Sequence, residues 1–95
     1  MKTKGNAAIG VAWYRKEQWG DLLGVSEDRD KLEATYGEWL IEANLALRRM
    51  RQSGMDIRKV DVDVEELVRW CREQGRPVNA ASRAYYVAER VKGEY

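Results

Sequence analysis

The spacing of hydrophobic residues changes period within residues 55–75. The first half of this segment contains the apolar residues Ile57, Val60, Val62 and Val64. The last three of them alternate strictly with polar residues, which is typical of a β-strand. A helical period then appears in Val64, Leu67, Val68 and Cys71. Asp63 stands at the change of period and Glu66 follows three residues later, which is the pattern of a capping box. The segment therefore predicts a strand, a helix N-cap and an amphipathic helix.

The N-terminal part of the chain predicts a tail, a strand and a short helix. We expect a flexible polar tail over residues 1–6 and a strand over 7–13, although its alanines would also suit a helix. One face of the strand would carry Ile9, Val11 and Trp13, and the other Ala8, Gly10, Ala12 and Tyr14. A helix over about 14–23 would then turn Trp19, Leu22 and Leu23 inward and end at Gly24.

A long helix is predicted between Ser26, as its N-cap, and about Gln52, with Gly54 as its stop. Its apolar side recurs at spacings of three and four residues in Leu32, Tyr36, Trp39, Leu40, Ala43, Leu47 and Met50. Gly37 lies inside this helix, where glycine costs about 1 kcal/mol relative to alanine. We therefore expect a kink, a close backbone contact or a break at Gly37.

The C-terminal part predicts one more helix. Gly75 ends the helix that begins after Asp63, and Pro77 enforces a turn. Asn79 is the expected N-cap of a helix over about 80–92. The apolar residues expected to face the core are Ala81, Ala84, Tyr85, Ala88 and Val91.

Together these segments give the order β-α-α-β-α-α. We predict a mainly helical α+β domain over residues 7–95, with two short strands covered by helices. The long connection between the strands permits a parallel pair. Two strands leave open edges, which favours self-association into a homodimer.

Composition excludes several classes of chemistry. The chain has 17 Lys+Arg and 16 Asp+Glu residues, so a net charge of +1 gives no overall attraction to nucleic acid or to an anionic membrane. It has no histidine, which excludes Ser-His-Asp and Cys-His sites and histidine metal ligands. A single cysteine excludes an internal disulfide and favours a cytoplasmic location. No segment approaches the ~20 apolar residues that cross a bilayer.

The acidic run Asp61, Asp63, Glu65 and Glu66 is the first candidate for chemistry. Paired carboxylates can hold Mg²⁺ or Ca²⁺, or can share acid–base work. The same residues also have a structural explanation. They would lie on a solvent-exposed strand face, at the N-cap position of Asp63 and in the first helical turn, where acids interact favourably with the helix dipole. We favour this structural interpretation and expect no metal and no cofactor. Cys71 shares the apolar helix face, so we expect it in the core.

The largest basic cluster contains Arg48, Arg49, Arg51, Arg58 and Lys59. Three of these cations fall in the last turn of the predicted long helix, where they offset the negative end of its dipole. Near an exposed Trp, the same strip could instead bind single-stranded nucleic acid.

Every aromatic side chain has a hydrogen-bonding tip, because the chain contains four Trp, five Tyr and no Phe. Such side chains suit half-wet protein interfaces, although both Trp of the segment 13–19 could instead face the core. Of the adjacent pair Tyr85 and Tyr86, one must face outward. The residues we expect to contact a partner are Trp13, Tyr14, Arg15, Trp19, Arg83 and Tyr86.

The overall pattern resembles a family of small uncharacterised bacterial proteins. The resemblance spans about residues 11–91 and is carried by Trp13-Tyr14, Trp19, Glu38-Trp39, the run DVDVEEL at 61–67, Trp70-Cys71 and Arg83-Ala84-Tyr85. It implies a bacterial, cytoplasmic, single-domain protein and brings no functional residues to this chain.

We therefore predict a non-enzymatic protein-interaction module that forms a homodimer through exposed Trp, Tyr and Arg side chains. The alternative is a small-ligand-binding domain or minor enzyme with a pocket lined by Trp, Tyr and Arg. Binding of single-stranded nucleic acid comes third.

Overall fold

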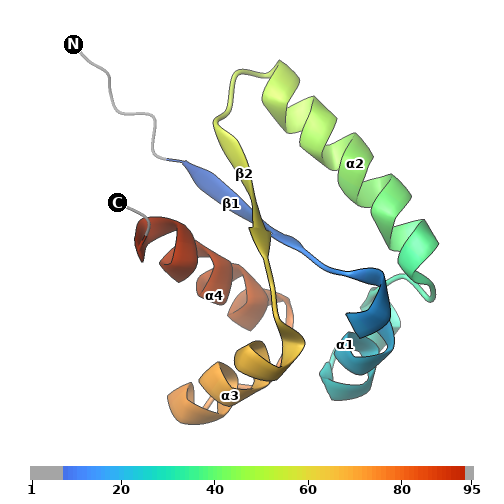
Figure 1. Cartoon of the computed structure of the whole chain (residues 1–95), viewed down its shortest axis with the longest axis vertical. Coiled ribbons are helices and arrows are strands. Elements are labelled where there is room, and N and C mark those ends of the chain that lie inside the picture. The colour runs from blue at the N-terminus through green and yellow to red at the C-terminus, as the bar shows by residue number, and fades with distance from the viewer. Residues whose placement is uncertain (1–7, 94–95) are drawn as a thin grey trace.

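The computed structural model describes residues 8–93, so the predicted tail over 1–6 lies outside the described residues. Its elements are β1 (Ile9–Trp13), η1 (Lys16–Gln18), α1 (Trp19–Val25), η2 (Arg29–Lys31), α2 (Tyr36–Gln52), β2 (Ile57–Asp61), α3 (Val64–Gln74) and α4 (Ala80–Gly93), where η marks a 3-10 turn. Four helices and a two-stranded sheet confirm the mainly helical α+β class (Figure 1).

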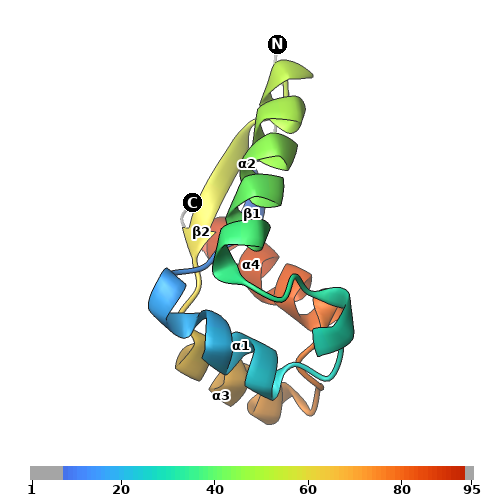
Figure 2. The same cartoon turned by 90° about the vertical axis from the view of Figure 1, so that its right-hand side faces the viewer.

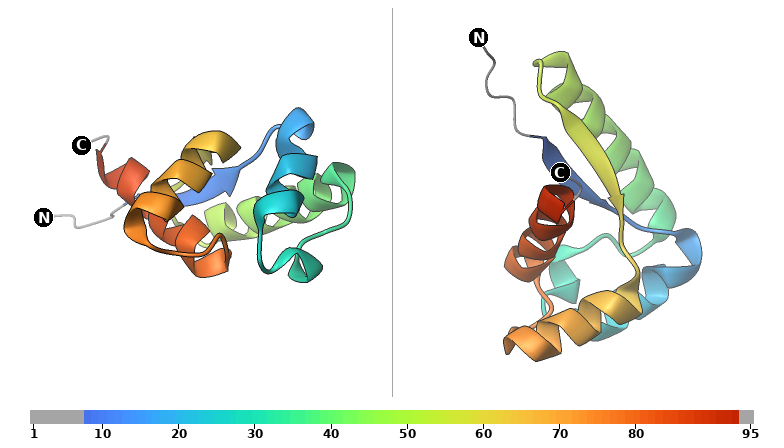
Figure 3. Two further views of the ribbon diagram at one scale, coloured as in Figure 1. Left: turned by 90° about the horizontal axis from the view of Figure 1, so that it is seen from below. Right: turned by 60° about the vertical axis from the view of Figure 1, so that its left-hand side comes forward.

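The two strands form a parallel pair, as their long connection allowed. Ile9 lies opposite Ile57, and Trp13 lies opposite Asp61. Helix α4 packs on one side of the pair and α2 on the other (Figure 1). Figure 2 shows α1 and α3 side by side beyond the end of the sheet, with α2 extending away from them. The right-hand view of Figure 3 shows no element in front of β2. The prediction that helices cover the strands is confirmed, and it applies to both faces.

Gly10 allows α4 to approach β1 closely. A Cβ atom at this position would stand 2.7 Å from Cγ1 of Val87 and 3.1 Å from Cγ2 of Val60, and it would overlap Cγ2 of Val91. Side chains in a packed interior have little room to move away. The small residue at position 10 therefore sets the distance between sheet and helix.

We predict that Gly10→Ala destabilises the protein by about 1–3 kcal/mol, because it overpacks the contact with Val87 and Val91. Urea unfolding followed by circular dichroism measures this change. Gly20→Ala is the matched control, because no atom lies within 4 Å of a Cβ built at Gly20. Equal urea midpoints for the two variants would contradict this role of Gly10.

The predicted long helix from Ser26 to Gln52 is wrong. Ser26 ends α1, the turn η2 follows, and α2 begins only at Tyr36. Thr35 is the true N-cap, since Oγ1 of Thr35 accepts from N–H of Glu38 at 3.2 Å and the Glu38 carboxylate accepts from N–H of Thr35 at 3.3 Å. This complete capping box fixes the helix start, and Gly37 is its second residue rather than an interior break.

The apolar side of α2 is nevertheless as predicted. Leu47 is buried, and the other stripe residues within the helix are half-buried: Tyr36, Trp39, Leu40, Ala43 and Met50. Leu32 lies before the helix and packs against the core from the loop. The period therefore identified the inward face although it did not locate the helix start.

The predicted boundaries of α1 need correction. The segment from Lys16 is a 3-10 turn, and the α-helix begins at Trp19. Gly24 does not end the helix, which continues to Val25. The predicted inward side chains are correct, since Trp19 and Leu22 are buried and Leu23 is half-buried.

The N-cap residues of α3 and α4 are as predicted, but only the Asp63 half of the predicted capping box forms, because the Glu66 carboxylate contacts Tyr86 and Arg90. Asp63 Oδ1 accepts from N–H of Glu66 at 3.1 Å, and Gly75 ends α3 with a φ of 66°, in the left-handed region that favours glycine. Asn79 Oδ1 accepts from N–H of Ser82 at 3.0 Å at the start of α4. Short-range patterns located these helix ends correctly.

The predicted inward face of α4 is wrong in all but Val91. The other four residues expected in the core are exposed: Ala81, Ala84, Tyr85 and Ala88. The buried side is formed by Ser82, Arg83, Tyr86, Val87 and Val91. The larger Tyr86 and Val87 bury more apolar surface than alanines do, and Gly10 leaves room for Val87. We call the exposed set Ala81, Ala84, Tyr85 and Ala88 the outer face of α4.

The core is continuous from the aromatic residues near α1 to the valines of α4. It contains Tyr14, Trp19, Leu22, Val60, Val62, Val64, Leu67, Cys71, Tyr86, Val87 and Val91. Within residues 8–93, none of the helices has the length and hydrophobicity needed to cross a membrane.

Candidate functional site

The aromatic corner predicted as a contact site is mainly core. Trp19 and Tyr14 are buried, and Trp13 is half-buried. Trp39 joins them from α2, with ring centroids 5.2 Å from Trp13, 5.3 Å from Tyr14 and 5.4 Å from Trp19. Tyr36 completes the cluster, 5.4 Å from Trp39. The alternative that the Trp side chains face the core is therefore correct for Trp19 and partly correct for Trp13.

Hydrogen bonds engage the polar tips of two residues in this cluster, Trp19 and Tyr36. Nε1 of Trp19 donates to the carbonyl of Glu33 at 3.2 Å, and the hydroxyl of Tyr36 donates to the carbonyl of Tyr14 at 3.0 Å. Burial raises the pKa of Tyr14 to about 12, and the positive charge of Arg83 opposes this rise. These contacts hold the loop before α2 and the segment after β1 together.

Arg83, another predicted contact residue, is also buried. Its guanidinium donates to both carboxylate oxygens of Asp28, at 3.1 and 2.8 Å, and to Oγ of Ser26 at 3.1 Å. Asp28 also accepts from the first N–H of α4, that of Ala80, at 3.1 Å. The hydrogen bond from Arg83 holds the pKa of Asp28 below its ordinary value. This ion pair joins the η2 turn to α4 across more than 50 residues, and no local pattern predicted it.

Tyr86, a predicted contact residue, is buried, and Tyr85, predicted to face the core, is 49% exposed. One of the adjacent pair faces outward, but it is the opposite one to the prediction. The Tyr86 hydroxyl donates to Oε1 of Glu66 at 3.3 Å, and Arg90 donates to the same hydroxyl at 3.2 Å. Burial raises the pKa of Tyr86. Tyr86 therefore links α3 to α4 from within the core rather than presenting itself at the surface.

The residues of the acidic run have separate structural roles, as the structural interpretation predicted. Asp61 is exposed and Asp63 caps α3, and both carboxylates face Arg15, at 3.5 and 3.8 Å. Glu66 pairs with Arg90 at 3.6 Å. Across the described residues, no three acidic or cysteine side chains cluster so that they could hold a metal ion. Arg15 is thus the exposed member of the predicted contact set.

Cys71 lies in the core with 1% of its surface exposed, as its helical register predicted. Burial raises the pKa of the Cys71 thiol, which lowers the fraction of reactive thiolate.

We predict that a thiol reagent labels the native protein slowly at pH 7.5 and labels it rapidly in urea. Absorbance after mixing with a disulfide reagent measures both rates. Stoichiometric labelling of the native protein within seconds would contradict the buried position.

A partly exposed aromatic and basic cluster lies elsewhere, at the junction of α3 and α4, with Trp70 and Arg76 half-buried and Tyr85 exposed. The rings of Trp70 and Tyr85 are 5.7 Å apart. The guanidinium of Arg76 lies 4.8 Å from the Tyr85 centroid and 5.9 Å from that of Trp70. Tyr85 belongs to the outer face of α4, so this cluster continues the exposed alanines. Sequence reasoning noted an outward Tyr but did not identify its Trp and Arg neighbours.

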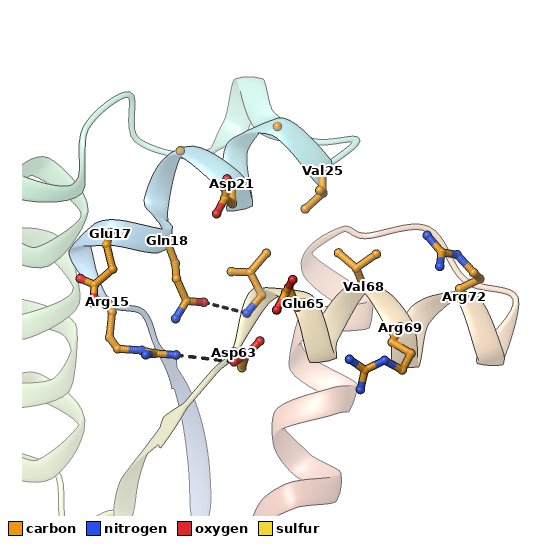
Figure 4. Close-up of a pocket in the computed structure, with 13 residues that line it drawn as sticks. Arg15, Glu17, Gln18, Asp21, Val25, Asp63, Glu65, Val68, Arg69 and Arg72 are labelled. Carbon is orange, nitrogen blue, oxygen red and sulfur yellow. Dashed lines mark hydrogen bonds and ion pairs between the residues drawn. The ribbon is translucent and has the colours of Figure 1, made fainter.

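A cleft of about 880 Å³ separates α1 from α3 (Figure 4). Gly20, Asp21 and Gly24 line it from α1. The α3 side is lined by Glu65, Val68, Arg69 and Arg72. Val25 and Val68 point into it from opposite sides (Figure 4). Its closed end is fixed by Gln18, whose Oε1 accepts from N–H of Val64 at 2.7 Å. The lining contains arginines but no Trp or Tyr.

A second groove, of about 580 Å³, lies between α2 and β2. Its lining residues are Asn44, Leu47, Arg48, Arg51, Gln52 and Lys59. The Lys59 ammonium lies 4.3 Å from the centroid of the Trp13 ring. Part of the predicted basic cluster therefore meets at one groove, together with the half-buried Trp13.

We compared the chain with protein-family models, curated proteins and solved structures, and none of them matches it.

Proposed function

We propose that the protein is a non-enzymatic protein-interaction module that self-associates through the outer face of α4. The observation that carries this proposal is an apolar helix face turned to solvent. Ala81, Ala84, Tyr85 and Ala88 recur at helical spacing and are exposed. Their apolar stripe predicted a core position, but no element within residues 8–93 covers it.

The neighbouring side chains fit a protein contact. Trp, Tyr and Arg dominate the binding energy of many protein interfaces, and Trp70, Arg76 and Tyr85 stack at the end of this face. Alanine side chains allow a second helix to approach closely. A second copy of α4, packed across a twofold axis, would bury both stripes at once.

Light scattering coupled to size-exclusion chromatography tests self-association. The wild type should give twice the chain mass of 11.0 kDa at high micromolar concentration. Ala84→Glu should give the monomer mass, because it places a carboxylate in the middle of the contact. Ala46→Glu is the matched control, since Ala46 is an exposed alanine of α2 and should leave the dimer intact.

Chemical crosslinking and affinity capture from the native host distinguish a second copy from another protein. A heterologous partner retained by wild type and Ala46→Glu but lost in Ala84→Glu would assign the same face to that partner. A monomeric wild type that retains no partner would overturn the proposal. We also propose a cytoplasmic location, which the single free cysteine supports, because thiols stay reduced there.

Small-ligand binding in the cleft between α1 and α3 is a second candidate, because its volume of about 880 Å³ falls within the range of ligand sites. Arg69 and Arg72 supply cations to a lining that also contains four carboxylates, those of Glu17, Asp21, Asp63 and Glu65. A thermal-shift screen of small carboxylates and phosphates tests this. Stabilisation that disappears in Val68→Trp, which fills the cleft, would support it, and an unchanged melting temperature with every compound would exclude it.

A further inference from the structure

We propose that the groove between α2 and β2 binds an extended acidic segment of a partner protein, which adds as a strand to the outer edge of β2. This surface is separate from the outer face of α4, so the inference goes beyond the proposed self-association. It rests on the direction of the backbone groups of β2 and on the charge of the groove.

The strand register shows which backbone groups of β2 face outward. The carbonyl of Asp56 accepts from N–H of Ile9, and N–H of Val62 donates to the carbonyl of Trp13. Successive residues of a strand direct these groups to opposite edges, so the even-numbered residues of β2 face β1. The backbone groups of Ile57, Lys59 and Asp61 therefore face the other edge. Within residues 8–93, no further strand pairs with that edge.

The groove beside this edge is positively charged. Arg48, Arg51 and Lys59 line it, and its lining contains no carboxylate. None of these three cations forms an ion pair with an acid of the described chain. Arg51 is held against the strand, because its guanidinium donates to the carbonyl of Ile57 at 3.1 Å. This contact occupies one acceptor of the outer edge, so strand addition would use the backbone groups of Lys59 and Asp61. Three cations concentrated here, on a chain with net charge +1, favour an acidic ligand.

Two exposed apolar side chains lie on α2 near the groove without lining it. Ile41 is 62% exposed and Leu45 is 37% exposed. Leu45 lies next to Arg48 on the helix surface, and Ile41 lies next to Asn44, because residues three or four positions apart are neighbours. An extended segment presents alternate side chains to opposite sides. Its acidic side chains would then meet the cations on the α2 side of the sheet, the alternate side chains would point to the opposite side, and its backbone would pair with β2.

The charge selects this occupant over a second copy of the chain. Pairing β2 with β2 of another copy would bring two groups of three like charges together, which is unfavourable. Nucleic acid would also meet the cations, but it has no peptide backbone to pair with the strand edge. A direct comparison of peptide and oligonucleotide separates these occupants.

Fluorescence anisotropy of a labelled eight-residue peptide of alternating Glu and Val, at low salt, tests the proposal. We expect saturable binding, which weakens about tenfold or more in the double variant Arg48→Glu/Lys59→Glu. It should also weaken at high salt, because exposed charges are screened. The matched control is Arg69→Glu/Arg72→Glu, which reverses two charges on α3 and should bind like wild type. A peptide of alternating Lys and Val should not bind.

Amide hydrogen exchange followed by NMR tests strand addition itself. The N–H groups of Arg58 and Val60 face β1 and should be protected without peptide, whereas those of Lys59 and Asp61 should exchange rapidly. Addition of the Glu-Val peptide should protect Lys59 and Asp61. Binding without this protection would overturn strand addition.

Three other results would also overturn the proposal: no peptide binding, tighter binding of a 15-nucleotide oligo-dT than of the peptide, or loss of a wild-type dimer in Arg48→Glu/Lys59→Glu. Self-association through α4 is measured separately with Ala84→Glu. The two proposals can therefore fail independently.

Discussion

Replacing Trp19 by alanine is expected to lower the free energy of unfolding by about 3–5 kcal/mol. The Trp19 side chain is 4% exposed and packs against Tyr14, Tyr36 and Trp39. Alanine would leave a cavity in the centre of this cluster and would remove the hydrogen bond to the carbonyl of Glu33. Urea unfolding followed by far-ultraviolet circular dichroism measures the loss without relying on tryptophan fluorescence.

Two controls separate packing from the hydrogen bond in this prediction. Trp19→Phe keeps most of the ring and should cost less than Trp19→Ala. Trp70→Ala removes a half-buried indole and should also cost less, because less apolar area returns to water. A loss below about 1 kcal/mol for Trp19→Ala would show that the aromatic corner is not part of the core.

Replacing Arg83 by methionine is expected to cost about 3–5 kcal/mol, because it leaves the carboxylate of Asp28 without its partner. The side chains of Arg83 and Asp28 are 9% and 13% exposed, so water compensates little for the lost contact. The double variant Asp28→Asn/Arg83→Met should be less destabilised than the sum of the single variants. Urea unfolding of all four proteins completes a double-mutant cycle.

The same ion pair predicts a dependence of stability on pH. Arg83 lowers the pKa of Asp28 in the folded protein, so the folded state favours the ionised carboxylate. This contribution is fully present above the unfolded-state pKa of about 3.9 and is lost as the pH falls through the lower folded-state pKa. Wild type should therefore lose more stability between pH 5 and pH 2 than Asp28→Asn. Parallel curves for the two proteins, or additive losses in the cycle, would contradict the coupling.

Segments whose structure depends on neighbouring residues could be predicted from the sequence. The strand β2, the cap at Asp63 and the helix α3 follow from alternation, a short-range hydrogen bond and a helical stripe. The glycine at 75 ends α3 for an equally local reason, its left-handed φ. The parallel pairing also followed, because the connection between the strands is long enough to cross over.

Features that depend on distant partners were missed. Ser26 looks like an N-cap, but its hydroxyl accepts from Arg83, which lies 57 residues away. The inward face of α4 was misassigned because Arg83 and Ser82 look like surface residues until their partners are known. Counting apolar residues favoured the alanines, whereas the volume available beside Gly10 favours Val87 and Val91.

Most candidate contact residues were also misassigned, because their burial depends on distant partners. A Trp, a Tyr and an Arg do meet at a partly exposed position, but they are Trp70, Tyr85 and Arg76 and not the predicted residues. Sequence could not distinguish them from Trp19 and Tyr86, because each helix has apolar residues on more than one side. The choice of face is made by packing between elements.

We propose that the exposed outer face of α4, and not the aromatic corner near Trp19, contacts the second copy of the chain. Amide and indole NMR shifts, compared between dilute and concentrated protein, test it most directly. The account predicts the largest changes at residues 81–88 and at the Trp70 indole, with the Trp19 indole unchanged. Changes centred on residues 13–19, or no change across the concentration range, would contradict it.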